Sequence, residues 1–258
     1  MDSKELQWHL RKVGKFSASR AADLMSASGK WIEGNIDYLY EIQYQRLTNE
    51  PTPPVYAKPM QIGIENEPYA VEWLRENYTS MVILHCDADF TEKVFDEPYP
   101  DLAFGVSPDA FVMKPDSGIT PDGSPYVYSE SFKQHIQSLV EIKCVVGRKN
   151  TVRYFSPTLP FEVKKEMALK EHRWQLAAQM FAYPAVERIY LLKYLPQMDD
   201  NQFDLRPVTD PARGLLFEFT RAEIAVEIMQ HEARLRYADA YLKSGKDLEM
   251  INTLKITL

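Results

Sequence analysis

The sequence predicts an α/β (α+β) fold in which helices flank a central mixed β-sheet. Two observations indicate it: apolar residues recur at helical spacing in the first part of the chain, and short runs rich in branched and aromatic residues follow. At 258 residues the chain can bury the core of one domain, and no linker rich in Pro, Gly or Ser divides the sequence. We therefore expect a single domain over residues 1–258.

The N-terminal part predicts helices separated by turns. Ser17 or Ser19 is expected to cap a helix that begins with RAADLM, and NIDYLYEIQYQRLT has the apolar spacing of a packing helix. After the turn-rich EPTPPVYAKP, we expect a helix from about Ile64 with Pro68 in its first turn. Glu67 lies early in that helix, where the helix dipole alone favours acidic residues.

The middle of the chain predicts strands and the end predicts helices. An inserted loop or hairpin is expected at about 114–137. In the helix KKEMALKEHRWQLAAQMFAY, Gln175 and Gln179 lie on one face, and burying them requires partners. The last helix, RAEIAVEIMQHEARLRYADAYLKSG, is predicted as outer packing or an oligomer contact. The expected strands are MVILHC, DFTEKVFDE, FGVSPDAFVM, SLVEIKC, VERIYLLKYL and GLLFEFT.

Polar side chains gather if the strands at FGVSPDAFVM and SLVEIKC pair. Because side chains alternate across a strand, Ser107 and Asp109 share one face, as do Glu141 and Lys143, whereas Ile142 points into the core. Two close carboxylates repel each other unless a cation lies between them, and oxygen ligands suit Mg²⁺. The alternative is a surface salt-bridge ladder, because E-x-K arises by chance in a chain rich in Glu and Lys.

Charge and composition limit the class of protein. A net charge of -7 argues against a protein that coats nucleic acid, but it permits an enzyme with a local basic track. Cys86 and Cys144 are expected as buried free thiols in a reducing cytoplasm, and no apolar run predicts a membrane span or a secretion signal. Two basic runs are either solvated helix faces or a phosphate-binding groove with rings for base stacking. Their members are Arg148, Lys149, Arg153, Tyr154, Phe155, Lys164, Lys165, Lys170 and Arg173.

Five motifs follow one another between about Trp8 and Tyr194. They are Trp8-x5-Gly14 followed by SAS, then Gly63-x3-Glu67, SPD, E-x-K and a helix with WQLAAQ. In this order they resemble the lambda exonuclease family of phage recombination nucleases, which belongs to the PD-(D/E)xK superfamily. The resemblance implies a restriction-endonuclease-like core and a Mg²⁺-dependent 5′→3′ exonuclease. That enzyme would digest one strand of double-stranded DNA from a 5′-phosphorylated end and leave 3′ single-stranded DNA.

The resemblance also implies partners and a catalytic set. It implies a ring-shaped homotrimer on DNA ends and a single-strand annealing protein as partner, in the cytoplasm of a bacterial host. Lys143 matches the lysine that orients or activates the attacking water, and Gln175 matches a glutamine near the scissile phosphate. The implied ligands of two Mg²⁺ ions, or of Mn²⁺ in their place, are oxygen atoms of Asp109, Glu141, Glu67 and the backbone carbonyl of Ile142.

Contacts to the DNA end are implied as well. Ser19 and Ser107 match hydroxyls that hold the 5′-phosphate. Lys12 stands where the family has an arginine, so this contact becomes a point charge in place of a bidentate fork, and the adjacent Arg11 could substitute. Met60 stands where the family has an apolar wedge that splits the terminal base pair.

Two other functions remain open at this stage. The same fold serves site-specific endonucleases and RecB-like nucleases, and cleavage of closed circular DNA would identify an endonuclease. A catalytically silent DNA-end-binding protein predicts an incomplete metal set, whereas Asp109, Glu141 and Lys143 are all present. The insertion at about 114–137 is longer than the family's usual connection, which leaves the shape of the DNA entrance undefined.

Overall fold

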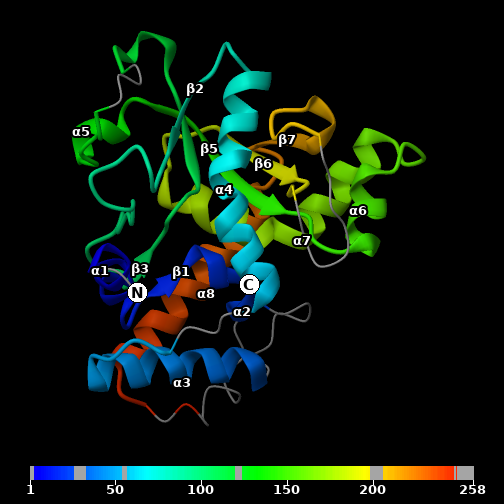
Figure 1. Cartoon of the computed structure of the whole chain (residues 1–258). Coiled ribbons are helices and arrows are strands. Elements are labelled where there is room, and N and C mark those ends of the chain that lie inside the picture. Colours follow the sequence, from blue (N-terminus) through cyan, green and yellow to red (C-terminus); the bar gives the residue numbers. More distant parts are fainter. Residues whose placement is uncertain are drawn as a thin grey trace.

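A five-stranded mixed β-sheet lies at the centre of the protein (Figure 1). The structure, a computed structural model, describes residues 3–25, 33–53, 57–119, 124–197, 206–246 and 248. The parallel pair is β5 with β6, and the other neighbours are antiparallel, which confirms the predicted mixed sheet. The strands, in spatial order, are β2 (Val82–His85), β4 (Ala110–Met113), β5 (Ile136–Cys144), β6 (Arg188–Tyr194) and β7 (Gly214–Thr220).

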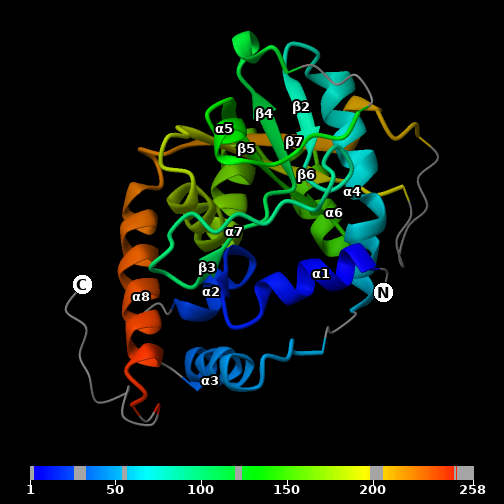
Figure 2. The same ribbon diagram turned by 90° about the vertical axis from the view of Figure 1, so that its left-hand side faces the viewer.

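Helices cover both faces of this sheet, as Figures 1 and 2 show. Helix α4 (Lys58–Asn77) packs on β2 and β5, and α7 (Phe161–Ala182) packs on the opposite face. Because neither face meets water, the strands are apolar on both sides, and a polar residue inside them needs a partner. The α4 side contains Trp73, Leu74, Val140, Ile142 and Leu192, and the α7 side contains Leu139, Leu176, Met180, Ile189 and Leu191.

A two-stranded parallel sheet brings the N-terminal segment to the central one. Strand β1 (Phe16–Ser17) pairs with β3 (Phe104–Gly105), and the Phe16 N–H donates to the Ala103 carbonyl at 2.9 Å. The residues after β1 therefore lie beside the chain that leads into β4. Figures 1 and 2 show the neighbouring helices below the central sheet: α1 (Ser3–Lys12), the 3₁₀ turn η1 (Ala18–Arg20), α2 (Ala21–Leu24) and α3 (Glu33–Thr48).

The last helix, α8 (Ala225–Lys243), packs along α7 and also contacts α2 and α3 (Figure 2). Its predicted role in outer packing is confirmed, and an oligomer contact remains a prediction. Among the residues that the structure describes, no helix is both long and apolar enough to cross a bilayer. The remaining elements are the short η2 (Pro115–Ser117), α5 (Glu130–Lys133) and η3 (Pro211–Arg213), and α6 (Arg148–Phe155).

The start of α4 differs from the prediction. The helix begins at Lys58 and not near Ile64, so Pro68 lies inside it. The proline in the first turn is Pro59, where the missing N–H costs nothing because the first amides of a helix lack partners anyway. Pro59 is therefore a better signal for the helix start than Pro68, although the sequence places Pro59 at the end of the turn-rich segment EPTPPVYAKP.

Two smaller predictions also differ, and a third stays untested. Neither Ser17 nor Ser19 caps a helix through its side chain; their hydroxyl oxygens lie 3.1 Å apart. The run DFTEKVFDE forms isolated bridges at Phe90 and Asp96 and no strand. The loop or hairpin at about 114–137 stays a prediction: its described parts, 114–119 and 124–137, contain short helical turns, and residues 120–123 lie outside the described residues.

Candidate active site

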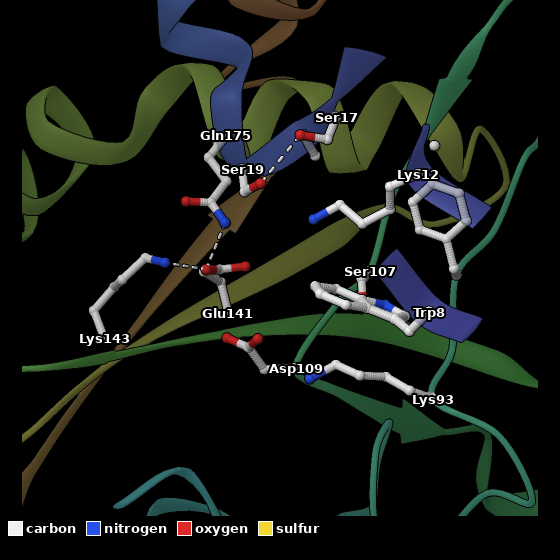
Figure 3. A pocket seen from close by; sticks show the side chains of 13 residues that line it. Trp8, Lys12, Ser17, Ser19, Lys93, Ser107, Asp109, Glu141, Lys143 and Gln175 are labelled. Carbon is white, nitrogen blue, oxygen red and sulfur yellow. Dashed lines mark hydrogen bonds and ion pairs between the residues drawn. The ribbon is translucent and has the colours of Figure 1, made fainter. Parts of the chain in front are cut away.

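A cavity of about 170 Å³ lies at one end of the sheet, between β5, α7 and the N-terminal segment (Figure 3). Its acidic side comes from the central sheet, the residue before β4 and α7, and its basic side from α1, β1, η1 and the segments before and after β3. The acidic side consists of Asp109, Glu141, Lys143 and Gln175. The basic side includes Trp8, Lys12, Ser17, Ser19, Lys93 and Ser107.

Glu141 is held in position through both of its carboxylate oxygens. Its side chain is buried, and it accepts hydrogen bonds from three donors. Oε1 accepts from Gln175 Nε2 at 2.6 Å and forms an ion pair with Lys143 Nζ at 2.5 Å, while Oε2 accepts from Gln179 Nε2 at 2.5 Å. The two glutamines lie four residues apart on α7, so they reach the same carboxylate from one helix face. Both oxygens are thus held in a fixed orientation before any ligand binds.

Asp109 precedes β4 directly and joins it to β5, because its Oδ2 accepts a hydrogen bond from the Ile142 N–H at 2.6 Å. Burial raises the pKa of Asp109 well above its usual value, and the negative charges of Glu141 and Glu67 raise it further. Burial lowers the pKa of Lys143, but the carboxylates of Glu141 and Asp109 outweigh burial and raise it. Lys143 is therefore an ammonium ion at neutral pH.

The strand pairing predicted for the site is confirmed by the antiparallel β4–β5 register. Asp109, Glu141 and Lys143 line one cavity, and Ile142 packs on the other face. Ser107 lies in the connection between β3 and β4 and not in a strand with Asp109, which corrects the prediction. Its hydroxyl donates to the Val94 carbonyl at 2.7 Å, although the residue lines the same cavity.

Glu67 lies near these groups but does not line the cavity. It projects from α4, and its Oε1 lies 2.8 Å from His85 Nε2. Its negative charge still raises the pKa values of Asp109 and of the buried thiol of Cys86, for both of which burial is the larger cause. In the described ranges, no group of three or more His, Cys, Asp or Glu side chains could by itself hold a metal ion.

The donor set nevertheless fits a divalent cation. Two carboxylates, Asp109 and Glu141, line the cavity with one ammonium group on their side, that of Lys143. Carboxylate and carbonyl oxygens are the ligands that Mg²⁺ prefers. Asp109 and Glu141 are the two side chains placed to hold such an ion, and Glu67 and the Ile142 carbonyl remain predicted ligands.

The basic side combines the predicted residues Lys12, Ser19 and Ser107 with Lys93, which the sequence did not single out. Lys12 Nζ lies 4.0 Å from the centre of the Trp8 ring, and Lys93 Nζ lies 4.9 Å from it. Burial, and after it the positive charges of Lys93 and Arg20, lower the pKa of Lys12 to about 8. Lys93 was missed because it lies in DFTEKVFDE, where the sequence offers no local motif.

Two residues predicted for the DNA end lie outside this cavity. Arg11 donates from Nη2 to the Phe95 carbonyl at 2.5 Å, and its Nη1 lies 3.7 Å from Glu92, so it does not stand in for Lys12 here. Met60 is half exposed in the first turn of α4 and does not line the cavity.

The prediction that the ring of Tyr154 is available for base stacking is wrong, because this side chain is buried and donates its hydroxyl to Glu171.

The comparisons with known proteins show the family and the fold. Residues 7–182, more than half of the chain, match the YqaJ-like viral recombinase domain. A structure of an alkaline exonuclease from Laribacter hongkongensis is similar, with a TM-score of 0.56, 22% identity and coverage of 93% of this chain and 97% of that one. A second structure of the Laribacter enzyme, in complex with dAMP, has 20% identity and the same TM-score, with coverage of 93% and 96%.

A phage-related exonuclease from Haemophilus somnus 129PT has a TM-score of 0.52, 14% identity and coverage of 90% and 96%. No curated protein sequence matches significantly. At these identities the structural matches show the fold alone, which agrees with the predicted mixed sheet flanked by helices. The match over residues 7–182 shows that the chain belongs to the family of YqaJ-like viral recombinase domains, which confirms the resemblance to lambda exonuclease.

Proposed function

We propose that this protein is a Mg²⁺-dependent 5′→3′ exonuclease that digests one strand of double-stranded DNA from a 5′-phosphorylated end and leaves 3′ single-stranded DNA. Membership of the viral recombinase family places it among recombination nucleases. The observation that carries the finer proposal is the buried Glu141, held by Gln175, Gln179 and Lys143 beside Asp109. A catalytically silent protein has no need of a carboxylate held so tightly.

The residues of the acidic side would have different roles in phosphodiester hydrolysis. Asp109 and Glu141 would hold Mg²⁺ ions, which supply charge relief at the scissile phosphate and the leaving oxygen. The Ile142 N–H keeps the Asp109 carboxylate oriented, and the α7 glutamines do the same for Glu141. Because Lys143 is an ammonium ion, it acts as a donor that stabilises developing negative charge on the phosphate and not as the base.

The proposed direction of digestion rests on the basic side of the cavity, which lies opposite Asp109 and Glu141. Lys12 and Ser19 line that side and would bind the 5′-phosphate. A strand whose terminal phosphate lies there would extend its first phosphodiester toward Asp109 and Glu141. The product would then be a 5′ mononucleotide, the class of compound to which dAMP belongs.

The wider proposal concerns assembly and location. A ring-shaped homotrimer would encircle the duplex, and a single-strand annealing protein would take over the 3′ strand in the bacterial host cytoplasm. Light scattering at working concentration tests the assembly, and a monomer would contradict the trimer alone. Met60, half exposed at the start of α4, remains the proposed wedge at the DNA end.

One gel assay tests the central proposal. Linear and covalently closed circular duplexes are incubated with the protein in Mg²⁺ and in EDTA, each linear duplex with and without a 5′-phosphate. We expect digestion of linear DNA in Mg²⁺ only, faster from phosphorylated ends. Cleavage of the circular duplex would identify an endonuclease instead, and equal rates on the two ends would remove the 5′-phosphate requirement.

A further inference from the structure

Two lysine ammonium groups converge on one indole ring at the basic side of the cavity. Figure 3 shows Lys12 and Lys93 on either side of Trp8, with both side chains reaching toward the side where Asp109 and Glu141 lie. The measured distances, 4.0 Å and 4.9 Å from each Nζ to the ring centre, are those of cation–π contacts. Because like charges repel, such an arrangement is unfavourable unless an anion joins it.

The basic side has donors without matching acceptors. No carboxylate in the described part of the chain forms an ion pair with Lys12, and the buried Trp8 Nε1 has no hydrogen-bond partner there. Lys93 has Asp87 at 3.6 Å, but the two side chains are 32% and 45% exposed, so this pair is weak. The positive charge of Lys93 also lowers the pKa of Lys12, after the larger effect of burial. Lys12 therefore has no carboxylate partner among the described residues, and Lys93 has only a weak one.

The backbone that carries Lys93 is fixed in place. Its neighbour Val94 is buried, and the Val94 N–H donates to the Cys86 carbonyl at 3.0 Å while its carbonyl accepts from the Ser107 hydroxyl at 2.7 Å. The ring of Phe95 then packs on Gly105, where a Cβ would lie 2.1 Å from the ring. Lys93 thus projects from a rigid segment, unlike a lysine on a solvent-exposed loop.

We propose that Lys93 acts with Lys12 as a two-cation subsite for the terminal 5′-phosphate, and that Lys93 sets the preference for phosphorylated ends. This inference rests on the proposed function, which by itself assigns only Lys12 as the cation at that phosphate. A terminal phosphate carries about -1.5 to -2 charges at pH 7, whereas a phosphodiester inside the strand carries one. Two ammonium groups match the terminal group, and one would leave it partly unneutralised.

The deciding experiment measures binding without cleavage. A blunt duplex with a 5′-phosphate and the same duplex with a 5′-hydroxyl are titrated in EDTA, and fluorescence anisotropy gives the ratio of the two dissociation constants. The proteins are the wild type, Lys93→Gln, Lys93→Arg and, as a matched control, Lys243→Gln. Lys243 pairs with Asp239 at 2.7 Å on α8, outside the cavity.

We expect the wild type to bind the phosphorylated duplex more tightly than the hydroxyl duplex. In Lys93→Gln the ratio of the two dissociation constants should shrink about tenfold, because a hydrogen bond from a charged group is removed. Lys93→Arg should keep most of the wild-type ratio, which shows that the segment still folds, and Lys243→Gln should keep all of it. An unchanged preference in Lys93→Gln, or no preference in the wild type, would overturn the inference. Digestion in Mg²⁺ is scored separately, so a protein that prefers phosphorylated ends but never cleaves them would refute the proposed function alone.

Discussion

The polar groups on the two sides of the cavity differ in how many hydrogen-bond partners the protein provides for them. On the acidic side, Glu141 accepts from three side chains and Asp109 accepts from a backbone N–H. On the basic side, Trp8 Nε1 has no hydrogen-bonding partner and Lys12 Nζ no carboxylate partner among the described residues. Side chains that hydrogen bonds already hold in position lower the free energy of the transition state. Donors without a partner, in contrast, can bind a ligand. Under the proposed function, the acidic side would carry out the chemistry and the basic side would select the DNA end.

The largest expected effect comes from Glu141→Gln on the acidic side. The substitution keeps the shape of the side chain but removes the charge that Lys143 neutralises and that a metal ion requires. We expect digestion to fall on the order of 10³-fold from phosphorylated and hydroxyl ends alike. Initial rates on both duplexes measure it, with thermal denaturation as the check on folding.

The matched control for that change is Glu218→Gln. Glu218 is a strand glutamate on β7 that accepts from the Tyr190 hydroxyl at 3.0 Å and lies outside the cavity. This variant should digest DNA at the wild-type rate. Near-normal digestion by Glu141→Gln, with a normal melting temperature, would contradict the division between the two sides.

A smaller loss is expected when one of the donors to Glu141 is removed. Gln179→Met keeps the length of a fully buried side chain but deletes the Nε2 donor to Glu141 Oε2. The Gln179 Oε1 atom is buried without a partner, so removing it offsets part of the stability cost. We expect about a tenfold lower rate on both kinds of end, because a hydrogen bond to a charged group is lost.

Rates on the two duplexes test this, with Gln61→Met as the control. Gln61 is exposed on α4 and donates to Glu65 at 2.9 Å, so its loss should change neither rate. If Gln179→Met altered the ratio between phosphorylated and hydroxyl ends and left the rate on hydroxyl ends intact, Gln179 would belong to end selection and not to the catalytic side.

The same division explains what the sequence could predict. The period of two along a strand is a local property, so it correctly placed Glu141 and Lys143 on one face and Ile142 on the other. The spacing of four between Gln175 and Gln179, with the cost of burying amides, indicated that they needed partners. Their partner is the Glu141 carboxylate.

The basic side could not be predicted in this way because no local pattern encodes it. Lys93 meets Lys12 and Trp8 only through tertiary structure: the two-residue strands β1 and β3 pair, and the Val94 backbone is fastened to Cys86 and to the β3–β4 connection. Two residues are too few to show a strand period. Arg11 also shows the limit of sequence proximity, because the residue next to Lys12 points to the Phe95 carbonyl.

The pH dependence sharpens the comparison on the basic side. Burial, then Lys93 and Arg20, lower the pKa of Lys12 to about 8, so its positive charge is present below that pH and is lost above it. The terminal phosphate is already doubly charged in this range, because its second pKa is about 6. We therefore expect the ratio of rates on phosphorylated and hydroxyl ends to fall by roughly fivefold between about pH 7 and pH 9.5.

Taking the ratio cancels any pH dependence that the acidic side imposes on both substrates. The control is Lys12→Arg, since a guanidinium stays charged throughout this range. Its ratio should remain flat with pH. A ratio that falls equally in the wild type and in Lys12→Arg would show that another group titrates, and Lys12 would lose its assigned part in end selection.

The smallest expected effect separates two roles for Ser107. Its hydroxyl proton is donated to the Val94 carbonyl, so in this arrangement the oxygen can only accept hydrogen bonds and cannot donate to a phosphate. We therefore expect Ser107 to act through Lys93, because it holds the backbone of the next residue, Val94. Ser107→Ala removes one neutral hydrogen bond, worth about 1 kcal/mol, and should lower the preference for phosphorylated ends by about threefold.

A double-mutant cycle with Lys93→Gln tests this role. If Ser107 acts through Lys93, Ser107→Ala has no further effect once Lys93 is replaced, because the group that it positions is gone. If the serine contacts the phosphate itself, the two losses multiply in the double variant. Ser19→Ala serves as the reference, since Ser19 bonds to Ser17 and not to the backbone of the Lys93 segment. Its effect should therefore persist in the Lys93→Gln background, and a Ser107→Ala effect that persisted equally would restore the serine as a direct phosphate contact.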